Sequence, residues 1–412
     1  MRAFPAVAYF CLAIFFQGCS FAHSQPQPAV KVGAKVLLDE YLPELKGKRV
    51  GLVMNPTARV DGSHMLDTLL ARGVNVTALF APEHGFRGDM GAGETIRNGV
   101  DQATGLPVFS LYGKTREPTP KMLKKVDLLL FDMQDVGARF YTYNSTLGNV
   151  IEAAAAQHVP VWVLDRPNPA GGNYISGWMM HGAHKSFVGK YPIPMAHGMT
   201  LGELAKMMVG ERWIKNAYKA EVRVIPMKGW RRSMKWPDTG LKWIPPSPNL
   251  PSFAHAFVYL GNVFFEGTNI SEGRGTPDPF LTIGAPTTQL TNNQIAKLNA
   301  DFAGVRVVRT TFTPKSIPGK SMHPDFEGQQ CHGVKIRVAN PDELDPIAFG
   351  AQLLKEMLKA TPDAHLKNYI QKLSGIDKQE LLNQLKDGSY LDKWKQTARK
   401  FAKERKPYLL YD

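Results

Sequence analysis

The first half of the chain alternates short apolar runs with amphipathic segments. Five runs are apolar at nearly every position, which predicts buried strands at 48–55, 74–80, 106–111, 126–132 and 159–165. Three segments between them have the spacing and end signals of helices: 63–73, with Ser63 as its cap, 119–126 and 147–158. Strands that are buried on both faces and alternate with helices predict a parallel sheet covered by helices on both sides.

The pattern changes after about residue 190. The capping box Thr200-Leu201-Gly202-Glu203 predicts a helix through Met208, and a Pro-rich loop follows at 243–252. Further strands are expected at 221–227, 256–267, 302–312 and 331–339, and helices at 342–360 and beyond. We therefore predict an α/β protein with a Rossmann-like parallel-sheet lobe at 36–190, a smaller α/β lobe at 191–412 and the active site in the cleft between them.

Residues 1–24 have the features of a secretory signal peptide. Arg2 is the only charged residue before Lys31, and the apolar run at 6–16 is shorter than a membrane span. Small and polar residues follow, and we expect a Pro-containing linker at 25–35. These features predict that the protein leaves the cytoplasm and works in the periplasm or another extracytoplasmic compartment.

Two processing sites compete at the end of this signal. Residues 22–24 fit cleavage before Gln25, whereas residues 16–19 resemble a bacterial lipobox that would make Cys19 a lipidated N-terminus. The usual Leu is absent three positions before Cys19, so we favour simple secretion. Membrane attachment through a lipidated Cys19 stays as the alternative.

The composition and charge of the chain indicate which partners and which catalytic groups are expected. The 412 residues are 43% hydrophobic and carry a formal net charge of +14. This basic surface either is a solvated face, the interpretation that we favour, or binds an anionic partner such as cell wall or lipid. An exported chain without a zinc-finger, RNA-binding or helix-turn-helix signature is not expected to bind nucleic acid. Cys331 is the only cysteine outside the signal region, and we interpret it as part of a buried strand, not as a nucleophile.

No cofactor or metal ion is predicted. No G-x-G-x-x-G stands between a strand and a helix, and the glycines of 88–94 have the wrong spacing for a dinucleotide. His84, Asp89 and His197 do not have the spacing of a metal-binding motif.

Polar side chains gather where the predicted strands of the first lobe end. Ligands of parallel sheets bind at the carboxyl ends of the strands, so residues that follow several strands should share one rim. This rim contains Asn55, Glu83, His84, Arg87, Asp132, Asp135, Arg139, Tyr143, Arg166 and Asn168. In the second lobe, one glycine-rich segment has similar chemistry, with Glu266, Asn269, Glu272 and Arg274. Functional loops on both lobes predict a cleft between them.

With these segments, the chain resembles the exo-β-N-acetylmuramidase family of the NamZ type. The resemblance covers about residues 36–412 and is carried by LFAPEHGFRGDMGAGE, SLYGKTREPTP, LLFDMQDVGARFYTY, VLDRPNPAGG, SFVGKYPIPMAHGMTLGEL, IPPSPNLP, EGTNISEGRGTPDPF and CHGV. It implies hydrolysis that releases N-acetylmuramic acid from the non-reducing end of peptidoglycan fragments, with muropeptides or disaccharides as partners. It also implies that Glu83 is the catalytic acid.

The residues themselves are consistent with a glycosidase. Such enzymes generally use two carboxyl groups, and the candidates for the partner of Glu83 are Asp135, which we rank first, Asp132, Glu266 and Glu272. His84 either orients Glu83 or bonds to the backbone. Arg139, Arg166 or Arg274 could bind the lactyl carboxylate of muramic acid, and Tyr141 and Tyr143 either stack on a sugar or pack in the core. A glycan-binding protein without turnover, or an esterase or transferase acting on wall sugars, is the alternative.

Overall fold

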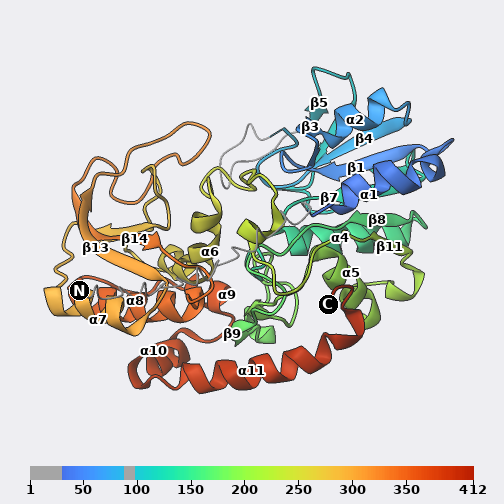
Figure 1. Ribbon diagram of the computed structural model, residues 1–412. Coiled ribbons are helices and arrows are strands. Elements are labelled where there is room, and N and C mark those ends of the chain that lie inside the picture. The colour runs from blue at the N-terminus through green and yellow to red at the C-terminus, as the bar shows by residue number, and fades with distance from the viewer. Residues whose placement is uncertain (1–29, 88–97) are drawn as a thin grey trace, which may run out of the picture.

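The computed structural model describes residues 30–87 and 98–412. The predicted signal peptide, Cys19, Asp89 and the glycines of 88–94 lie outside these residues. Within them, no helix is both long and apolar enough to cross a bilayer. Two lobes lie side by side, one coloured blue to green and the other yellow to red (Figure 1).

The first lobe is built on a seven-stranded sheet with the order β11-β8-β7-β1-β4-β6-β5. Its strands are β1 (Val50–Met54), β4 (Val76–Ala81), β5 (Gly99–Val100), β6 (Pro107–Ser110), β7 (Leu128–Asp132), β8 (Val161–Leu164) and β11 (Val222–Ile225). All neighbours pair in parallel except β5 with β6. Without β5, the order is that of a Rossmann fold, in which ligands bind beyond the carboxyl ends of the strands.

Helices cover both faces of this sheet, as the sequence pattern predicts. Alternate strand residues point to opposite sides, so Leu52 and Leu130 join one core cluster while Val53 and Phe131 join the other. The first face is covered by α1 (Gly33–Val36) and α2 (Met65–Ala71), and the second by α3 (Pro120–Leu123), α4 (Tyr143–Ala156) and α5 (Leu201–Gly210). The capping box at Thr200 is confirmed, but α2 is capped by His64 and not by Ser63.

The second lobe has a three-stranded antiparallel sheet with the order β12-β14-β13. Its elements are α6 (Phe253–Asn262), β12 (Thr282–Ala285), α7 (Asn292–Asp301), β13 (Val305–Phe312), β14 (Cys331–Val338), α8 (Pro346–Ala360), α9 (Ile370–Ser374), α10 (Lys378–Asp387) and α11 (Tyr390–Glu404). The predicted strands at 302–312 and 331–339 and the helix at 342–360 are confirmed within a few residues. Cys331 is buried at the start of β14.

The strand predicted at 256–267 is wrong, because this segment forms α6 and a 3-10 turn at Val263–Gly267. Its residues are apolar on all sides because α6 is buried against α8 and against the first lobe. Gly261 faces Gly350 so closely that a Cβ atom at position 261 would lie 3.0 Å from the Cα atom of Gly350. A short buried run has no helical or strand periodicity, so the pattern alone could not distinguish the two.

Segments far apart in the sequence tie the two lobes together. Figure 1 shows α11 running beneath both lobes, and Trp394 of α11 packs its ring 4.8 Å from that of Trp178 in β9 (Ser176–Met179). We predicted a lobe boundary near residue 190, whereas β11 at 222–225 forms an edge of the first sheet. The end of the predicted linker is also ordered, because Val30 and Gly33 bond through their backbone N–H groups to Thr239 and Asp165.

Candidate active site

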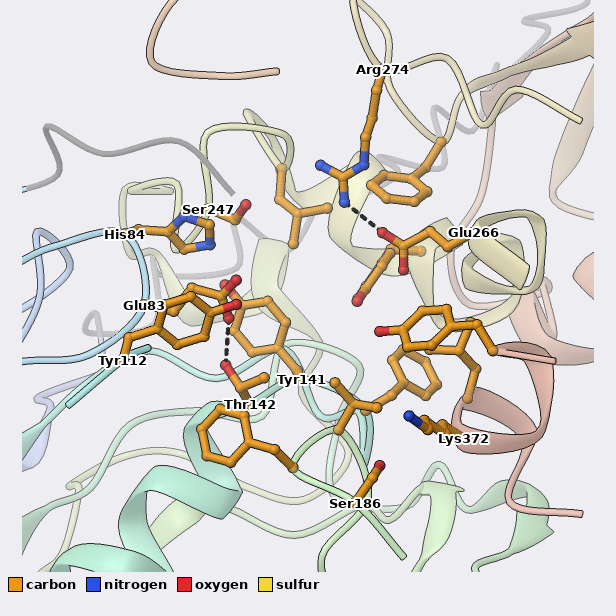
Figure 2. A pocket seen from close by; sticks show the side chains of 18 of the residues that line it. Glu83, His84, Tyr112, Tyr141, Thr142, Ser186, Ser247, Glu266, Arg274 and Lys372 are labelled. Carbon is orange, nitrogen blue, oxygen red and sulfur yellow. Dashed lines mark hydrogen bonds and ion pairs between the residues drawn. The ribbon is translucent and has the colours of Figure 1, made fainter. Parts of the chain in front are cut away.

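A pocket of about 350 Å³ lies where the two lobes meet. This volume is within the range of about 300–1,000 Å³ that is typical of small-molecule sites. Its two acids are Glu83 from the first lobe and Glu266 from the second, and its lining cations are Arg116, Arg274 and Lys372. Aromatic rings from both lobes complete the lining: Tyr112, Phe140, Tyr141, Phe187, Tyr259, Phe280 and Tyr369. Figure 2 shows Glu83 on one side of the pocket and Glu266 with Arg274 on the other.

The turn after β4 presents Glu83 to this pocket. The N–H of Gly85 donates to the carbonyl of Pro82 over 3.1 Å, which closes a tight turn directly after the strand. His84 has a φ of +72° although it is not a glycine, and its side chain is buried. Non-glycine residues rarely adopt such a conformation, because it costs free energy that the surrounding structure must offset. The turn at 82–85 therefore orients the carboxyl group of Glu83 toward the pocket.

A hydroxyl group and several phenols surround the Glu83 carboxyl. Thr142 Oγ1 donates to Glu83 Oε2 over 2.8 Å (Figure 2). Burial, together with the nearby charge of Glu83, raises the pKa of Tyr112, Tyr143 and Tyr369 well above the usual value for tyrosine. These phenols are therefore neutral at physiological pH. They surround Glu83 with polar groups that carry no charge.

Glu266 and Arg274 form the opposite wall. Arg274 lies 2.5 Å from Glu266 and 2.9 Å from Glu272, and its guanidinium stacks 5.2 Å from the ring centre of Phe280. Burial raises the pKa of Glu272 to about 6, against the lowering effect of Arg274. Protein carboxylates therefore already balance the charge of Arg274.

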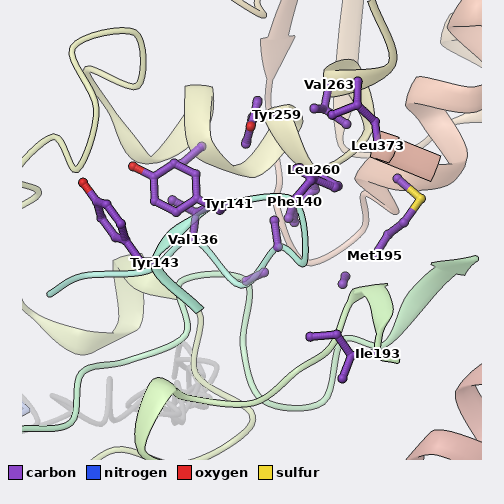
Figure 3. Packing of buried hydrophobic residues seen from close by; sticks show 14 of the residues in the cluster. Val136, Phe140, Tyr141, Tyr143, Ile193, Met195, Tyr259, Leu260, Val263 and Leu373 are labelled. Carbon is purple, nitrogen blue, oxygen red and sulfur yellow. The ribbon is translucent and has the colours of Figure 1, made fainter. Parts of the chain in front are cut away.

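The aromatic part of the lining is held by core packing. Tyr141 packs edge-on against Tyr143, with ring centres 4.8 Å apart, and Phe140 packs against Tyr259 of α6 at 5.3 Å (Figure 3). Behind them, Asn55 Nδ2 donates to the Tyr143 hydroxyl over 2.7 Å, and this hydroxyl donates to the carbonyl of Pro246 over 2.7 Å. These contacts join the strand-end loops to α6, so the pocket is preformed.

Comparison with known proteins identifies the family. The model described as "Exo-beta-N-acetylmuramidase NamZ, N-terminal" matches residues 50–254, and its C-terminal counterpart matches residues 257–411. A peptidoglycan β-N-acetylmuramidase NamZ of Bacillus subtilis (strain 168) is 42% identical over 393 residues, which is 93% of this chain and 92% of that protein. The chain belongs to the exo-β-N-acetylmuramidase NamZ family. It is a glycosidase, and the resemblance and enzyme class predicted from the sequence are confirmed.

Crystal structures of two DUF1343 family proteins from Bacteroides fragilis NCTC 9343 have the same fold. One is 33% identical with a TM-score of 0.82 and covers 94% of this chain and all of that one. The other is 35% identical with a TM-score of 0.77 and covers 93% of this chain and 99% of that one. The predicted fold class, a Rossmann-like lobe beside a smaller α/β lobe, is therefore confirmed.

Five of the residues that we predicted for the site line the pocket: Glu83, His84, Tyr141, Glu266 and Arg274. Three others lie directly behind it, namely Asn55, Tyr143 and Glu272. The remaining predicted residues lie elsewhere: Arg87, Asp132, Asp135, Arg139, Arg166, Asn168 and Asn269.

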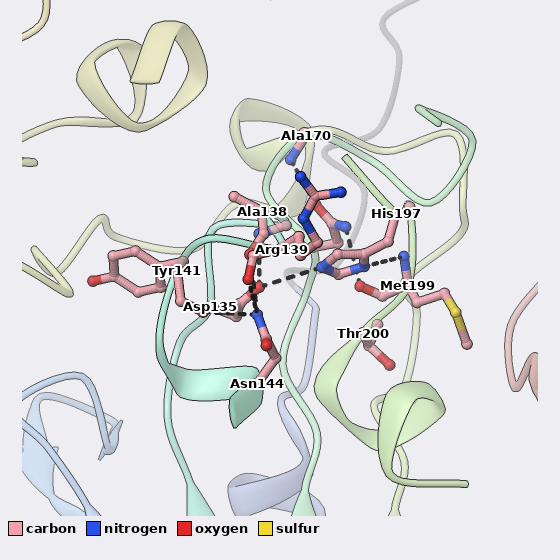
Figure 4. Close-up of polar contacts among 12 residues, drawn as sticks. Asp135, Ala138, Arg139, Tyr141, Asn144, Ala170, His197, Met199 and Thr200 are labelled. Carbon is pink, nitrogen blue, oxygen red and sulfur yellow. Dashed lines mark hydrogen bonds and ion pairs between the residues drawn. The ribbon is translucent and has the colours of Figure 1, made fainter. Parts of the chain in front are cut away.

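Asp135, which we ranked first as the partner of Glu83, is buried below the pocket and does not line it. Its Oδ2 accepts from the N–H of Gly137 over 2.8 Å and lies 3.9 Å from His197 Nε2 (Figure 4). Burial raises the pKa of Asp135 to about 7, and burial and three nearby arginines lower the pKa of His197 to about 3. This pair supports the loop that carries Tyr141 and Thr142.

Two arginines predicted to face the cleft do not reach it. Arg166 forms a buried ion pair with Asp132, with Nε 2.5 Å from Oδ1 and Nη2 3.0 Å from Oδ2. Arg139 is completely buried and donates to the carbonyls of Trp178, Ile193, Leu373 and Ser374 over 2.6–2.9 Å. Neither Arg139 nor Arg166 lines this pocket, contrary to our expectation, because Arg139 is buried against backbone carbonyls and Arg166 is paired with Asp132.

Three further predicted residues have structural contacts away from the pocket. Arg87 pairs with Asp101 at 2.6 Å and with Asp67 at 3.3 Å. Asn168 Nδ2 donates to the carbonyl of Met199 over 3.1 Å. Asn269 bridges to the loop before α9, where its Nδ2 donates to the carbonyl of Asp363 and its Oδ1 accepts from the N–H of His365.

Sequence reasoning missed several lining residues. Tyr112 and Arg116 are in one of the segments that carry the family resemblance, so that segment was a signal for them. Tyr369 and Lys372 come from a short helix far along the chain, and no local pattern marks them. Within the two described ranges, no cluster of three histidine, cysteine or acidic side chains has the arrangement of a metal site.

Proposed function

We propose that this protein is an exported exo-β-N-acetylmuramidase that releases N-acetylmuramic acid from the non-reducing ends of peptidoglycan fragments. The observation that carries this proposal is Glu83, held by Thr142 in an aromatic pocket between the lobes, in a chain that matches this family over nearly its whole length. Its biological role would then be the turnover or recycling of cell-wall fragments.

In the proposed reaction, Glu83 donates a proton to the glycosidic oxygen as the bond to the leaving sugar breaks. The hydrogen bond from Thr142 Oγ1 to Oε2 orients the carboxyl group of Glu83 toward the sugar. We assign the role of second carboxyl group to Glu266, which lines the facing wall and would either activate the attacking water or bond to the anomeric carbon before water does.

Turnover tests the proposal. Purified protein should hydrolyse a chromogenic β-N-acetylmuramide and should cleave the corresponding β-N-acetylglucosaminide hardly at all. Release of N-acetylmuramic acid from a disaccharide with muramic acid at its non-reducing end should be visible by chromatography. Tight binding of these sugars without any product would instead favour a glycan-binding protein.

Export is the second part of the proposal and rests on residues 1–24. Fractionation of cells that express the full chain should find the protein outside the cytoplasm. Labelling with a palmitate analogue separates the two processing routes. Simple secretion predicts no label, whereas a label that disappears in Cys19→Ala would show lipidation.

A further inference from the structure

The pocket contains three cationic side chains, and they differ in what they bind. Arg274 is paired with Glu266 and Glu272. Arg116 lies 4.6 Å above the ring of Phe187 and pairs with no carboxylate of the described residues. Lys372 Nζ has neither a hydrogen bond nor an ion pair within the same part of the chain. The positive charges that remain for a ligand are therefore those of Lys372 and Arg116.

Lys372 points inward, although it comes from the second lobe. Figure 2 shows its ammonium group directed into the pocket, on the side away from Glu83. Lys372 is exposed to solvent, so its ammonium group can exchange water for a ligand without a large desolvation cost. A sugar whose glycosidic oxygen meets Glu83 would thus have its opposite edge near Lys372.

The backbone that carries Lys372 is fixed to the first lobe. Arg139 Nη2 donates to the carbonyls of Leu373 and Ser374 over 2.9 and 2.7 Å, directly after Lys372. Gly375 then turns the chain with a φ of +82°, and a Cβ atom there would lie 2.7 Å from Arg139 Nη2. This close approach needs a glycine. The buried arginine that we expected to bind substrate instead holds the helix that presents Lys372.

We propose that Lys372, assisted by Arg116, binds the carboxylate of an acidic sugar in this pocket and thereby determines the preference for muramides over glucosaminides. The inference rests on the proposed function for the identity of the sugar. An ammonium group and a guanidinium both form charge-assisted hydrogen bonds with a carboxylate. A glucosaminide has no such group and leaves both cations in water.

The test compares three substrates that differ only at this position: a chromogenic muramide, the same compound with its lactyl carboxylate converted to a primary amide, and the glucosaminide. Lys372→Met keeps an apolar stem of similar length and removes the charge. Because the site is open to solvent, we expect kcat/KM for the muramide to fall by about tenfold, mainly through KM. Hydrolysis of the amide should change less than about twofold.

Three controls separate charge recognition from a structural effect. Lys372→Arg keeps the charge and should restore most of the preference. Lys378→Met removes a nearby lysine whose Nζ contacts Asn368, outside the pocket, and should change nothing. In the wild type, the preference for the muramide over its amide should shrink as salt is added. An unchanged preference in Lys372→Met would overturn the inference.

A binding measurement keeps this inference distinct from the proposed function. Calorimetric titration with N-acetylmuramic acid and with its amide needs no turnover. If the wild type binds the acid better than the amide and Lys372→Met does not, the inference stands even if no substrate is cleaved. If the wild type binds both equally, it fails even if muramides are hydrolysed.

Discussion

The wall of the pocket formed by the first lobe differs from the facing wall in how its charges are used. In the first lobe, Asp132 ends β7 and Asp135 and Arg139 follow it, yet all three are buried in contacts within the protein. In this lobe, Glu83 in the turn after β4 lines the pocket with its neighbour His84, and Arg116 lines it from the loop after β6. In the second lobe, Glu266, Arg274 and Lys372 all line the pocket.

This contrast teaches that a charged residue at a strand end is not by itself a site residue. An arginine or carboxylate that is buried must be paired or hydrogen-bonded, and strand-end loops supply such partners close at hand. The paired groups fix the geometry of the wall, and the one carboxyl group that projects from the turn after β4 is left for chemistry. Substitutions can remove either the projecting carboxyl group or one of the buried, paired groups.

The largest effect is expected from Glu83→Gln. Loss of a general acid should lower kcat on a muramyl disaccharide by roughly 10²–10⁴-fold, while the circular dichroism spectrum and melting temperature stay close to those of the wild type. Asp135→Asn is the matched comparison, since it also neutralises a carboxyl group but outside the pocket, and it should keep most of the activity. If kcat fell equally in the two variants, Glu83 could not be distinguished from a carboxyl group that only supports the structure.

Arg139→Met should reduce stability and not only activity. It leaves four buried carbonyls without their donor, which should lower the free energy of unfolding by at least about 3 kcal/mol. Arg49→Met is the control, because Arg49 forms a similar two-pronged pair with Asp127 on the surface, and its loss should matter much less. Urea denaturation of both variants measures the difference. A urea midpoint for Arg139→Met close to that of the wild type would show that the four hydrogen bonds of Arg139 are dispensable for stability.

A smaller effect concerns pH. The pKa of Asp135 is raised by burial from 3.8 to about 7, so its favourable contribution is present below pH 3.8 and lost as the pH rises toward 7. The pKa of His197 is lowered from 6.5 to about 3, so its contribution is present above pH 6.5 and lost as the pH falls. In the wild type, these two dependences oppose each other between about pH 4 and 6.5.

Asp135→Asn removes only the first of these dependences and keeps an oxygen that can accept from the N–H of Gly137. Relative to the wild type, the variant should therefore become progressively more stable from pH 4 to pH 7.5. Urea denaturation at several pH values in this range provides the measurement. A stability difference that does not vary with pH would mean that Asp135 titrates as an ordinary exposed carboxyl.

The sequence predicted the sheet lobe well because its strands are marked by continuous apolar runs and its helices by their end signals. The turn with Glu83 was predicted for the same reason, since a functional segment directly after a buried strand is visible in the sequence. The α6 segment was misread because burial on all sides removes the helical period.

The partners of the charged residues could not be predicted. Arg139 bonds to carbonyls that are up to 235 positions away along the chain, and nothing local distinguishes it from an arginine that faces a ligand. Lys372 was missed for the reverse reason, because one exposed lysine in a basic helical region has no pattern of its own. Long-range folding decides which of two similar charges is paired and which is free to bind.

The role of Glu83 as the proton donor is tested most directly by the leaving group. A series of aryl β-N-acetylmuramides with leaving groups of increasing pKa should be hydrolysed by the wild type at rates that depend only weakly on that pKa. For Glu83→Gln, the rate should fall steeply along the series, with the smallest loss for the most acidic phenol, since that leaving group needs little protonation. A loss in Glu83→Gln that is the same for every leaving group would contradict proton donation by Glu83.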